Sequence, residues 1–150
     1  MVTLGYYLSV GFALELLSKS KYHAQFLARD YLRDEVLPPL SKGNVKFYLC
    51  KDYSPSAMVT WAYVSEAVEA ELHATGRTLY FDEWNCGDRV FINDLIAPYQ
   101  NSRSVIHDIK NNLFPNSRAT SIRRNDDASV KKINQWTGVN VLTDTKQRTK

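Results

Sequence analysis

The most constraining feature of the sequence is one short apolar run, residues 90–97, that carries an acidic side chain. Turn-forming residues at 85–88 precede the run and Pro98 closes it, so the pattern predicts one bounded β-strand. Because the run is apolar on both faces, we expect a central strand of a sheet. Burying Asp94 within such a strand costs free energy unless another group pairs with the carboxylate.

Regular alternation along a β-strand divides its side chains between the two faces of the sheet. In that arrangement, Asp94 shares its face with three aliphatic residues, Val90, Ile92 and Ile96. The opposite face carries Phe91, Asn93 and Leu95. A partner for the Asp94 carboxylate must therefore come from elsewhere in the chain.

Length and composition are typical of one soluble globular domain. The chain has 150 residues, of which 44% are hydrophobic and 23% are charged. The net charge of +3 is uneven, because residues 117–150 hold eight Lys or Arg against three Asp, a net charge of +5. This basic part is suited to an acidic partner, and a merely solvated surface is the alternative.

The cysteines and the N-terminus indicate a cytoplasmic protein. Cys50 and Cys86 are the only cysteines and have no metal-ligand spacing, so we expect free thiols, a reducing compartment and no metal site. No Lys or Arg precedes Lys19, so the apolar N-terminus lacks the basic region of a signal peptide. The apolar stretch at 2–17 is also too short to span a bilayer.

Apolar periodicity and turn residues divide the chain into helices and strands. The predicted helices cover residues 3–18, 24–36, 65–74 and 101–113. The predicted strands cover residues 45–49, 57–63, 90–97, 119–123 and 130–135. Helices and strands mixed around one sheet favour an α/β or α+β fold. We expect a single domain over residues 1–142 and a frayed basic tail over residues 143–150.

Local signals predict several element boundaries. Pro38 and Pro39 are expected to stop the second helix, because proline disrupts a helix interior. The two strands within residues 45–63 are separated by a turn sequence and predict a hairpin. Ser65 is expected to cap the following helix and Gly76 to end it.

His23 is the histidine best placed to do chemistry. The sequence contains no Gly-rich dinucleotide or phosphate loop, no HExxH and no GxSxG. His73 and His107 lie beside charged residues on predicted helices, where we expect solvated side chains. His23 lies between two helices, close to Ser20, and a histidine held by a buried carboxylate can serve as a general base. Asp94 is the candidate carboxylate, but sequence alone does not bring the two together.

Seven short pieces of the sequence, in order and at their spacings, resemble the toxin-activating lysine-acyltransferases of RTX toxins over roughly residues 4–138. The pieces are Leu4-Gly5, Ser20-x-x-His23, Val36-Leu37-Pro38, Thr60-Trp61-Ala62 followed by Val64-Ser65, Glu83-Trp84-x-x-Gly87-Asp88, Asp94-x-Ile96-Ala97-Pro98 and Ser121-Ile122-Arg123. The resemblance implies a GNAT-like (N-acetyltransferase-like) fold, with a mixed central sheet flanked by helices. It also implies that His23 and Asp94 are the catalytic residues.

The same resemblance implies transfer of a fatty acyl chain from acyl carrier protein to internal lysines of a protoxin. His23 would then take the proton of the lysine nitrogen, Asp94 would orient His23, and backbone N–H groups near Ile96 would stabilise the oxyanion. Arg123 is the candidate on the acyl-carrier side. No bound cofactor is implied, since acyl carrier protein is the donor substrate. The partners are the carrier and the protoxin, and dimerisation and a covalent acyl-histidine step stay open.

Other functions remain alternatives. The first is a small GNAT-like N-acyltransferase that uses acyl-CoA, although residues 98–104 lack the Gly-rich loop that usually binds its pyrophosphate. The second is a catalytically idle binding module of the same fold, against which the presence of His23 and Asp94 speaks. A nucleic-acid binder is weaker still, because the basic residues are not interleaved with aromatics. The chain departs from the family pattern at Tyr99-Gln100 and at Cys86, which bears on the acyl chain and the target.

Overall fold

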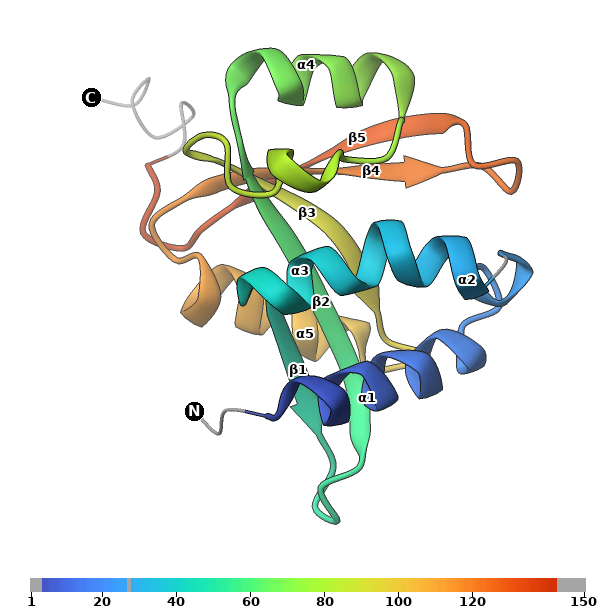
Figure 1. The fold of residues 1–150 in the computed structure, drawn as a ribbon. Coiled ribbons are helices and arrows are strands. Elements are labelled where there is room, and N and C mark those ends of the chain that lie inside the picture. The colour runs from blue at the N-terminus through green and yellow to red at the C-terminus, as the bar shows by residue number, and fades with distance from the viewer. Residues whose placement is uncertain (1–3, 27, 143–150) are drawn as a thin grey trace.

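In the part of the chain that the computed structural model describes, residues 4–26 and 28–142, five β-strands lie side by side in chain order in one mixed sheet (Figure 1). The strands are β1 (Val45–Leu49), β2 (Pro55–Val64), β3 (Arg89–Ile96), β4 (Arg118–Arg124) and β5 (Val130–Thr137). Neighbouring strands are antiparallel, except that β3 and β4 are parallel. The mixed α/β class predicted from the sequence is confirmed, and the arrangement is consistent with a GNAT-like fold.

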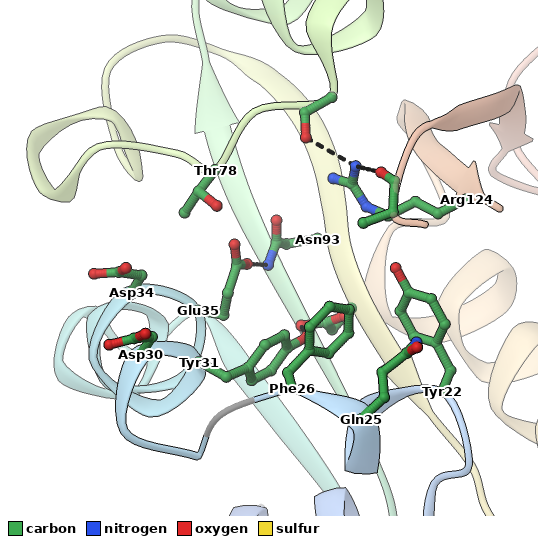
Figure 2. A pocket seen from close by; sticks show the side chains of 13 residues that line it. Tyr22, Gln25, Phe26, Asp30, Tyr31, Asp34, Glu35, Thr78, Asn93 and Arg124 are labelled. Carbon is green, nitrogen blue, oxygen red and sulfur yellow. Dashed lines mark hydrogen bonds between the residues drawn. The ribbon is translucent and has the colours of Figure 1, made fainter. Parts of the chain in front are cut away.

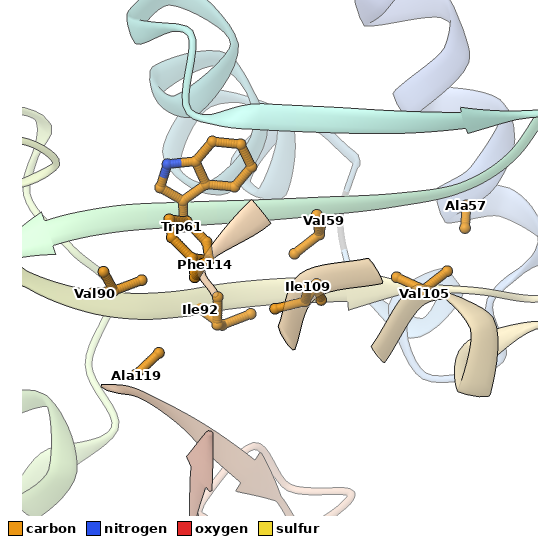
Figure 3. Close-up of a cluster of buried hydrophobic side chains, with 9 residues drawn as sticks. All are labelled: Ala57, Val59, Trp61, Val90, Ile92, Val105, Ile109, Phe114 and Ala119. Carbon is orange, nitrogen blue, oxygen red and sulfur yellow. The ribbon is translucent and has the colours of Figure 1, made fainter. Parts of the chain in front are cut away.

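Helical segments cover both faces of this sheet. They are α1 (Tyr6–Lys19), the 3₁₀ turn η1 (His23–Gln25), α2 (Ala28–Tyr31), the π-helical turn η2 (Leu32–Val36), α3 (Leu37–Lys42), α4 (Glu66–Thr75), the 3₁₀ turn η3 (Phe81–Glu83), α5 (Ser102–Asp108) and the π-helical turn η4 (Ile109–Leu113). Leu16 of α1 and Leu40 of α3 pack with Met58 of β2 on one face. Val105 of α5 and Ile109 of η4 pack in a cluster on the opposite face (Figure 3).

Several predicted local features are confirmed. Strands β1 and β2 form the expected antiparallel hairpin. The Ser65 hydroxyl accepts a hydrogen bond of 3.2 Å from the backbone N–H of Val68 and so caps α4. Gly76 ends α4 with φ of 67°, a left-handed conformation that glycine adopts without strain. Strand β3 is central, as its two apolar faces predict.

The predicted stop at the two prolines is wrong. The π-helical turn η2 leads directly into α3, and Pro38 and Pro39 occupy the first turn of α3. The first N–H groups of a helix have no partner within it, so proline is tolerated there. The helical segment ends instead at Gly43, with φ of 74°. Leu27 of the second predicted helix lies outside the described residues, as does the tail predicted to fray, residues 143–150.

A β-bulge interrupts β3 at Asn93. Thr60 of β2 pairs with Asp94, whereas the next residue of β2, Trp61, pairs with Ile92, which leaves Asn93 as an extra residue. A bulge of this kind redirects the side chains that follow it, and bulges are common beside functional sites.

The bulge changes the face of the sheet on which Asp94 lies. Val90 and Ile92 pack in the cluster under α5, whereas Ile96 packs in the cluster under α1. Asp94 is paired with Thr60 on the same side as Ile96, facing the segment from η1 to α3. The prediction that Asp94 shares a face with Val90 and Ile92 is therefore wrong, because regular alternation does not allow for an inserted residue.

Strands β3 and β4 diverge soon after they meet. Their only paired positions in the described chain are Val90 with Ala119 and Phe91 with Thr120. Figure 1 shows β4 and β5 turning away from the lower half of β3. Beyond Phe91 the edge of β3 that faces β4 therefore has no ladder partner among the described residues, which leaves backbone groups there for other contacts.

Within residues 4–26 and 28–142, no helix has the length and apolar character needed to cross a bilayer.

Two glycines provide a test of this fold. A Cβ built on Gly87 would lie 2.3 Å from the backbone of Val64 and of Ser65, whereas a Cβ on Gly11, in α1, meets nothing within 4 Å. We predict that Gly87→Ala lowers the free energy of unfolding by about 1–3 kcal/mol, as overpacking does. Gly11→Ala should instead raise it by about 0.5–1 kcal/mol. Chemical denaturation of both variants checks this, and a Gly87→Ala protein as stable as the wild type would contradict the packing described.

Candidate active site

Two side chains from the helical segments hold the Asp94 carboxylate. Nε2 of His23 lies 3.1 Å from Oδ1 of Asp94, and the Tyr31 hydroxyl donates a hydrogen bond to Oδ2. Only 9% of the His23 side chain and 15% of the Asp94 side chain are exposed. The structure therefore places in contact the two residues that the sequence pointed to separately, and it adds Tyr31 as a second partner.

The partners of His23 determine which ring nitrogen carries the proton. Asp94 as a carboxylate can only accept, so Nε2 carries the hydrogen that is shared with Oδ1. The other nitrogen, Nδ1, lies 2.6 Å from Oγ of Ser20 and accepts a hydrogen bond from this hydroxyl. The basic lone pair of His23 thus points at Ser20, and the three side chains form a Ser–His–Asp chain of hydrogen bonds.

Aromatic rings enclose His23. Its ring makes edge contacts with Tyr22, at 5.1 Å between centroids, and with Tyr31, at 5.5 Å. Phe26 stacks on Tyr31 at 5.5 Å. Burial, with the nearby Asp94 charge, raises the pKa of Tyr31 far above its ordinary value, so the hydroxyl stays protonated and remains a donor to Asp94.

Three cavities meet at this enclosure. The inter-strand cavity, of about 280 Å³, lies where β3 and β4 diverge and is lined by Ile92–Leu95, Ser121–Arg124, Tyr22, His23, Asn134 and Trp136. The Ser20 cavity, of about 410 Å³, is lined by Lys19–His23, Leu95–Pro98 and Ser102. The third cavity, of about 490 Å³, lies between the η1–η2 segment and β3 (Figure 2). We call it the acidic cavity, because its lining includes Asp30, Asp34, Glu35 and Asp94. Tyr22 borders all three.

The other two predicted site residues lie on different cavities. Arg123 is exposed on β4 and lines the inter-strand cavity. Ile96 lines the Ser20 cavity, but its side chain is only 2% exposed and belongs to the core under α1. Any contact of Ile96 with a ligand would therefore involve its backbone.

The remaining histidines differ from each other. His107 is exposed, as predicted. His73 is half-buried, and its Nε2 lies 2.9 Å from the Thr120 hydroxyl, which in turn donates to Glu69. The prediction that His73 is solvated is wrong, because α4 packs its inner side against β4. No group of three potential ligands placed to hold a metal ion is found within the described ranges.

Sequence reasoning gave no role to three residues of the enclosure, although it noted that Ser20 lies close to His23. Ser20 carried a signal, because it precedes His23 by three residues, the spacing of one helical turn. Tyr31 and Glu35 carried none beyond their place in a predicted helix. Their contacts with Asp94 and Asn93 depend on how that helical segment packs on the sheet.

Comparison with known proteins finds a matching family model and several relatives. Residues 8–137 match the sequence model of HlyC, the RTX toxin acyltransferase family. An uncharacterised protein of Synechocystis, sll0720, is 31% identical over 72% of this chain and 71% of its own length. The lysine-acyltransferase RtxC of Vibrio cholerae is 27% identical over 70% of this chain and 68% of its own. The leukotoxin-activating lysine-acyltransferase LtxC of Aggregatibacter actinomycetemcomitans is 30% identical over 86% and 75%.

Two tyrosines test how Asp94 is held. Tyr31→Phe keeps the ring stacked on Phe26 but leaves Oδ2 of Asp94 without its donor. We predict that the free energy of unfolding falls by about 1–3 kcal/mol, the cost of a buried acceptor that loses its partner. Tyr22→Phe is the matched control, because the Tyr22 hydroxyl is buried and has no partner in the described part of the chain. Equal stability of the two variants, measured by urea unfolding, would contradict the role given to Tyr31.

Proposed function

Because the chain belongs to the RTX toxin acyltransferase family, we propose that it moves a fatty acyl group from acyl carrier protein to the ε-amino group of a lysine in a protoxin. The family supports acyl transfer, and the names of the relatives RtxC and LtxC support lysine as the acceptor. The observation that carries the proposal is the His23–Asp94 contact at the mouth of the gap between β3 and β4. Such a gap can admit an extended acyl thioester beside a base.

The proposed reaction uses the orientation of His23. The lysine nitrogen, as a neutral amine, forms a bond to the thioester carbonyl carbon, and the carbon–sulfur bond then breaks. The proton lost by the nitrogen passes through the Ser20 hydroxyl to Nδ1 of His23, and His23 returns it to the thiolate that leaves. Asp94 keeps its hydrogen bond to Nε2 and stabilises the imidazolium formed in between.

The diverging edge of β3 supplies the remaining electrostatic stabilisation in this proposal. Negative charge develops on the thioester oxygen in the tetrahedral intermediate, and backbone N–H groups are the usual donors for it. Among the described residues the edge of β3 beyond Phe91 has no ladder partner, which supports N–H donors in the stretch up to Ile96. Neither the acyl chain nor the carrier then needs to displace a strand of the sheet.

The His23–Asp94 pair is tested by a double-mutant cycle. We predict that His23→Ala and Asp94→Asn each lower single-turnover acyl transfer by roughly two to four orders of magnitude. The double variant should be little worse than either, because the two residues act as a unit. Intact mass of a candidate protoxin, sampled over time after mixing with excess enzyme and acyl donor, reports the rate through the fatty acyl increment. Losses that multiply in the double variant would show that the residues act independently, and absence of acylation by the wild type would overturn the function.

Arg123 tests the donor. Acyl carrier proteins are acidic, and Arg123 is exposed in the basic C-terminal part, whereas the guanidinium of Arg124 is already bound to the carbonyl oxygens of Gly76 and Ala128. Arg123→Glu should raise KM for the acyl carrier protein and flatten its salt dependence, while KM for acyl-CoA of equal chain length stays unchanged. The control is Lys51→Glu, at the exposed β1–β2 turn.

The wild type should also use the carrier far better than acyl-CoA. Comparable single-turnover rates with both donors would contradict acyl carrier protein as the preferred donor and favour acyl-CoA instead.

A further inference from the structure

The acidic cavity is a feature that the proposed chemistry does not use. Its lining holds four carboxyl groups, of Asp30, Asp34, Glu35 and Asp94, and one cationic group, of Arg124. Arg33, outside the lining, is ion-paired with Asp30 and Asp34, at 3.7 Å and 2.8 Å. Figure 2 shows Glu35 directed from η2 towards β3. Glu35 has no ion pair with Lys or Arg within residues 4–26 and 28–142, so this part of the concave site is suited to a cationic ligand.

The bulge in β3 directs two adjacent side chains to this cavity. The amide of Asn93, the extra residue, donates a hydrogen bond of 2.6 Å to Oε2 of Glu35. Asp94, the next residue, lines the same cavity and contacts His23 on its other side. The cavity therefore leads from Glu35 to Asp94, one member of the pair proposed to carry out the reaction.

Glu35 is placed where its charge is not balanced. Burial raises the pKa of Glu35 to about 7, and the neighbouring Asp94 charge adds to this effect. Hydrogen bonds from Asn93 and Thr78 and the charge of Arg124 oppose it without cancelling it. The Nη1 group of Arg124 instead donates hydrogen bonds to the backbone carbonyl oxygens of Gly76 and Ala128. A cation entering the cavity would compensate Glu35.

A second observation also indicates a polar ligand. The hydroxyl of Tyr22 is buried without a hydrogen-bond partner among residues 4–26 and 28–142. Tyr22 lines the acidic cavity beside Arg124 and also borders the two other cavities. An unpartnered buried hydroxyl costs free energy, which a polar ligand group recovers.

We propose that the acidic cavity binds the side chain of the acceptor lysine, with Glu35 holding its ammonium group. After this group has lost one proton to solvent, the neutral amine passes Tyr22, which borders all three cavities, and reaches Ser20 and the His23–Asp94 pair. This inference rests on the proposed function and specifies the acceptor side of it. The acyl donor enters through the inter-strand cavity, and the lysine arrives from the other side of Asn93 and Asp94, which line both cavities. Glu35 is then the residue that selects an amine over a hydroxyl or a carboxylate.

The pH dependence of binding follows from the same arrangement. A protonated Glu35 cannot compensate an ammonium group, so affinity for lysine should increase as the pH rises through about 7. The pKa values of the facing Tyr22 and Tyr31 are raised, so both stay neutral in this range. Asp94 also faces Glu35 and keeps its partners His23 and Tyr31. Replacing Glu35 isolates its own contribution from theirs.

The experiment measures binding of two small probes to the full chain. The probes are Nα-acetyl-lysine methylamide and its norleucine analogue, which has an apolar side chain and no ammonium group, titrated at pH 6, 7 and 8 with detection by amide NMR. We expect the lysine probe alone to bind, more tightly at pH 8 than at pH 6. Glu35→Gln should weaken binding about tenfold at pH 8 and remove the pH dependence. Glu35→Asp should keep part of the affinity, and Glu15→Gln, exposed on α1, should change nothing.

The outcomes separate this inference from the proposed function. Equal binding of both probes, or unchanged lysine binding by Glu35→Gln, overturns the assignment of the cavity. If the Glu35→Gln variant still transfers the acyl group to lysine with an unchanged KM for the acceptor, the assignment of the cavity is overturned while the proposed function stands. Lysine binding that depends on Glu35, without any acyl transfer, supports the cavity and overturns the function. Thermal unfolding at pH 8 checks that each variant is folded. The Glu35→Gln variant should be at least as stable as the wild type at this pH, because a carboxyl group with a raised pKa destabilises the fold once it is ionised.

Discussion

The arrangement of this protein depends on the contacts of the Asp94 carboxylate, which is largely enclosed, with 15% of the side chain exposed. A charge within the central strand requires partners, and the partners come from the helical segment between α1 and α3, through His23 and Tyr31. These contacts tie the segment to the sheet at the point where β3 leaves β4. The same carboxylate therefore serves the packing of the fold and the geometry of the candidate active site.

Much of the fold could be predicted from local signals in the sequence. The β1–β2 hairpin, the Ser65 cap and the central position of β3 each follow from side chains close together in the chain. The errors occurred where the backbone departs from regular periodicity. Pro38 lies in the first turn of α3, which follows a π-helical turn directly, and the bulge at Asn93 moves the later side chains of β3 to the opposite face of the sheet. Neither is visible in a hydrophobic pattern that assumes constant spacing.

The candidate site could be predicted only in part. His23 and Asp94 stand out by residue type and by resemblance to a family, and their contact is found at 3.1 Å. Tyr31 and Glu35 resemble ordinary helix residues in the sequence, because their importance comes from long-range packing. Contacts between residues more than fifty positions apart, such as Asn93 with Glu35, require the tertiary structure.

The bulge at Asn93 means that the position of the carboxylate depends on strand length as well as on residue identity. Removing one residue from β3 would restore regular alternation and carry every later side chain to the opposite side, with each amino acid otherwise unchanged. In an evolutionary lineage of such proteins, a one-residue deletion could thus abolish the site while every residue needed for chemistry is still present in the gene. Judging whether a relative is active therefore requires counting residues between its strands, as well as finding its histidine and aspartate.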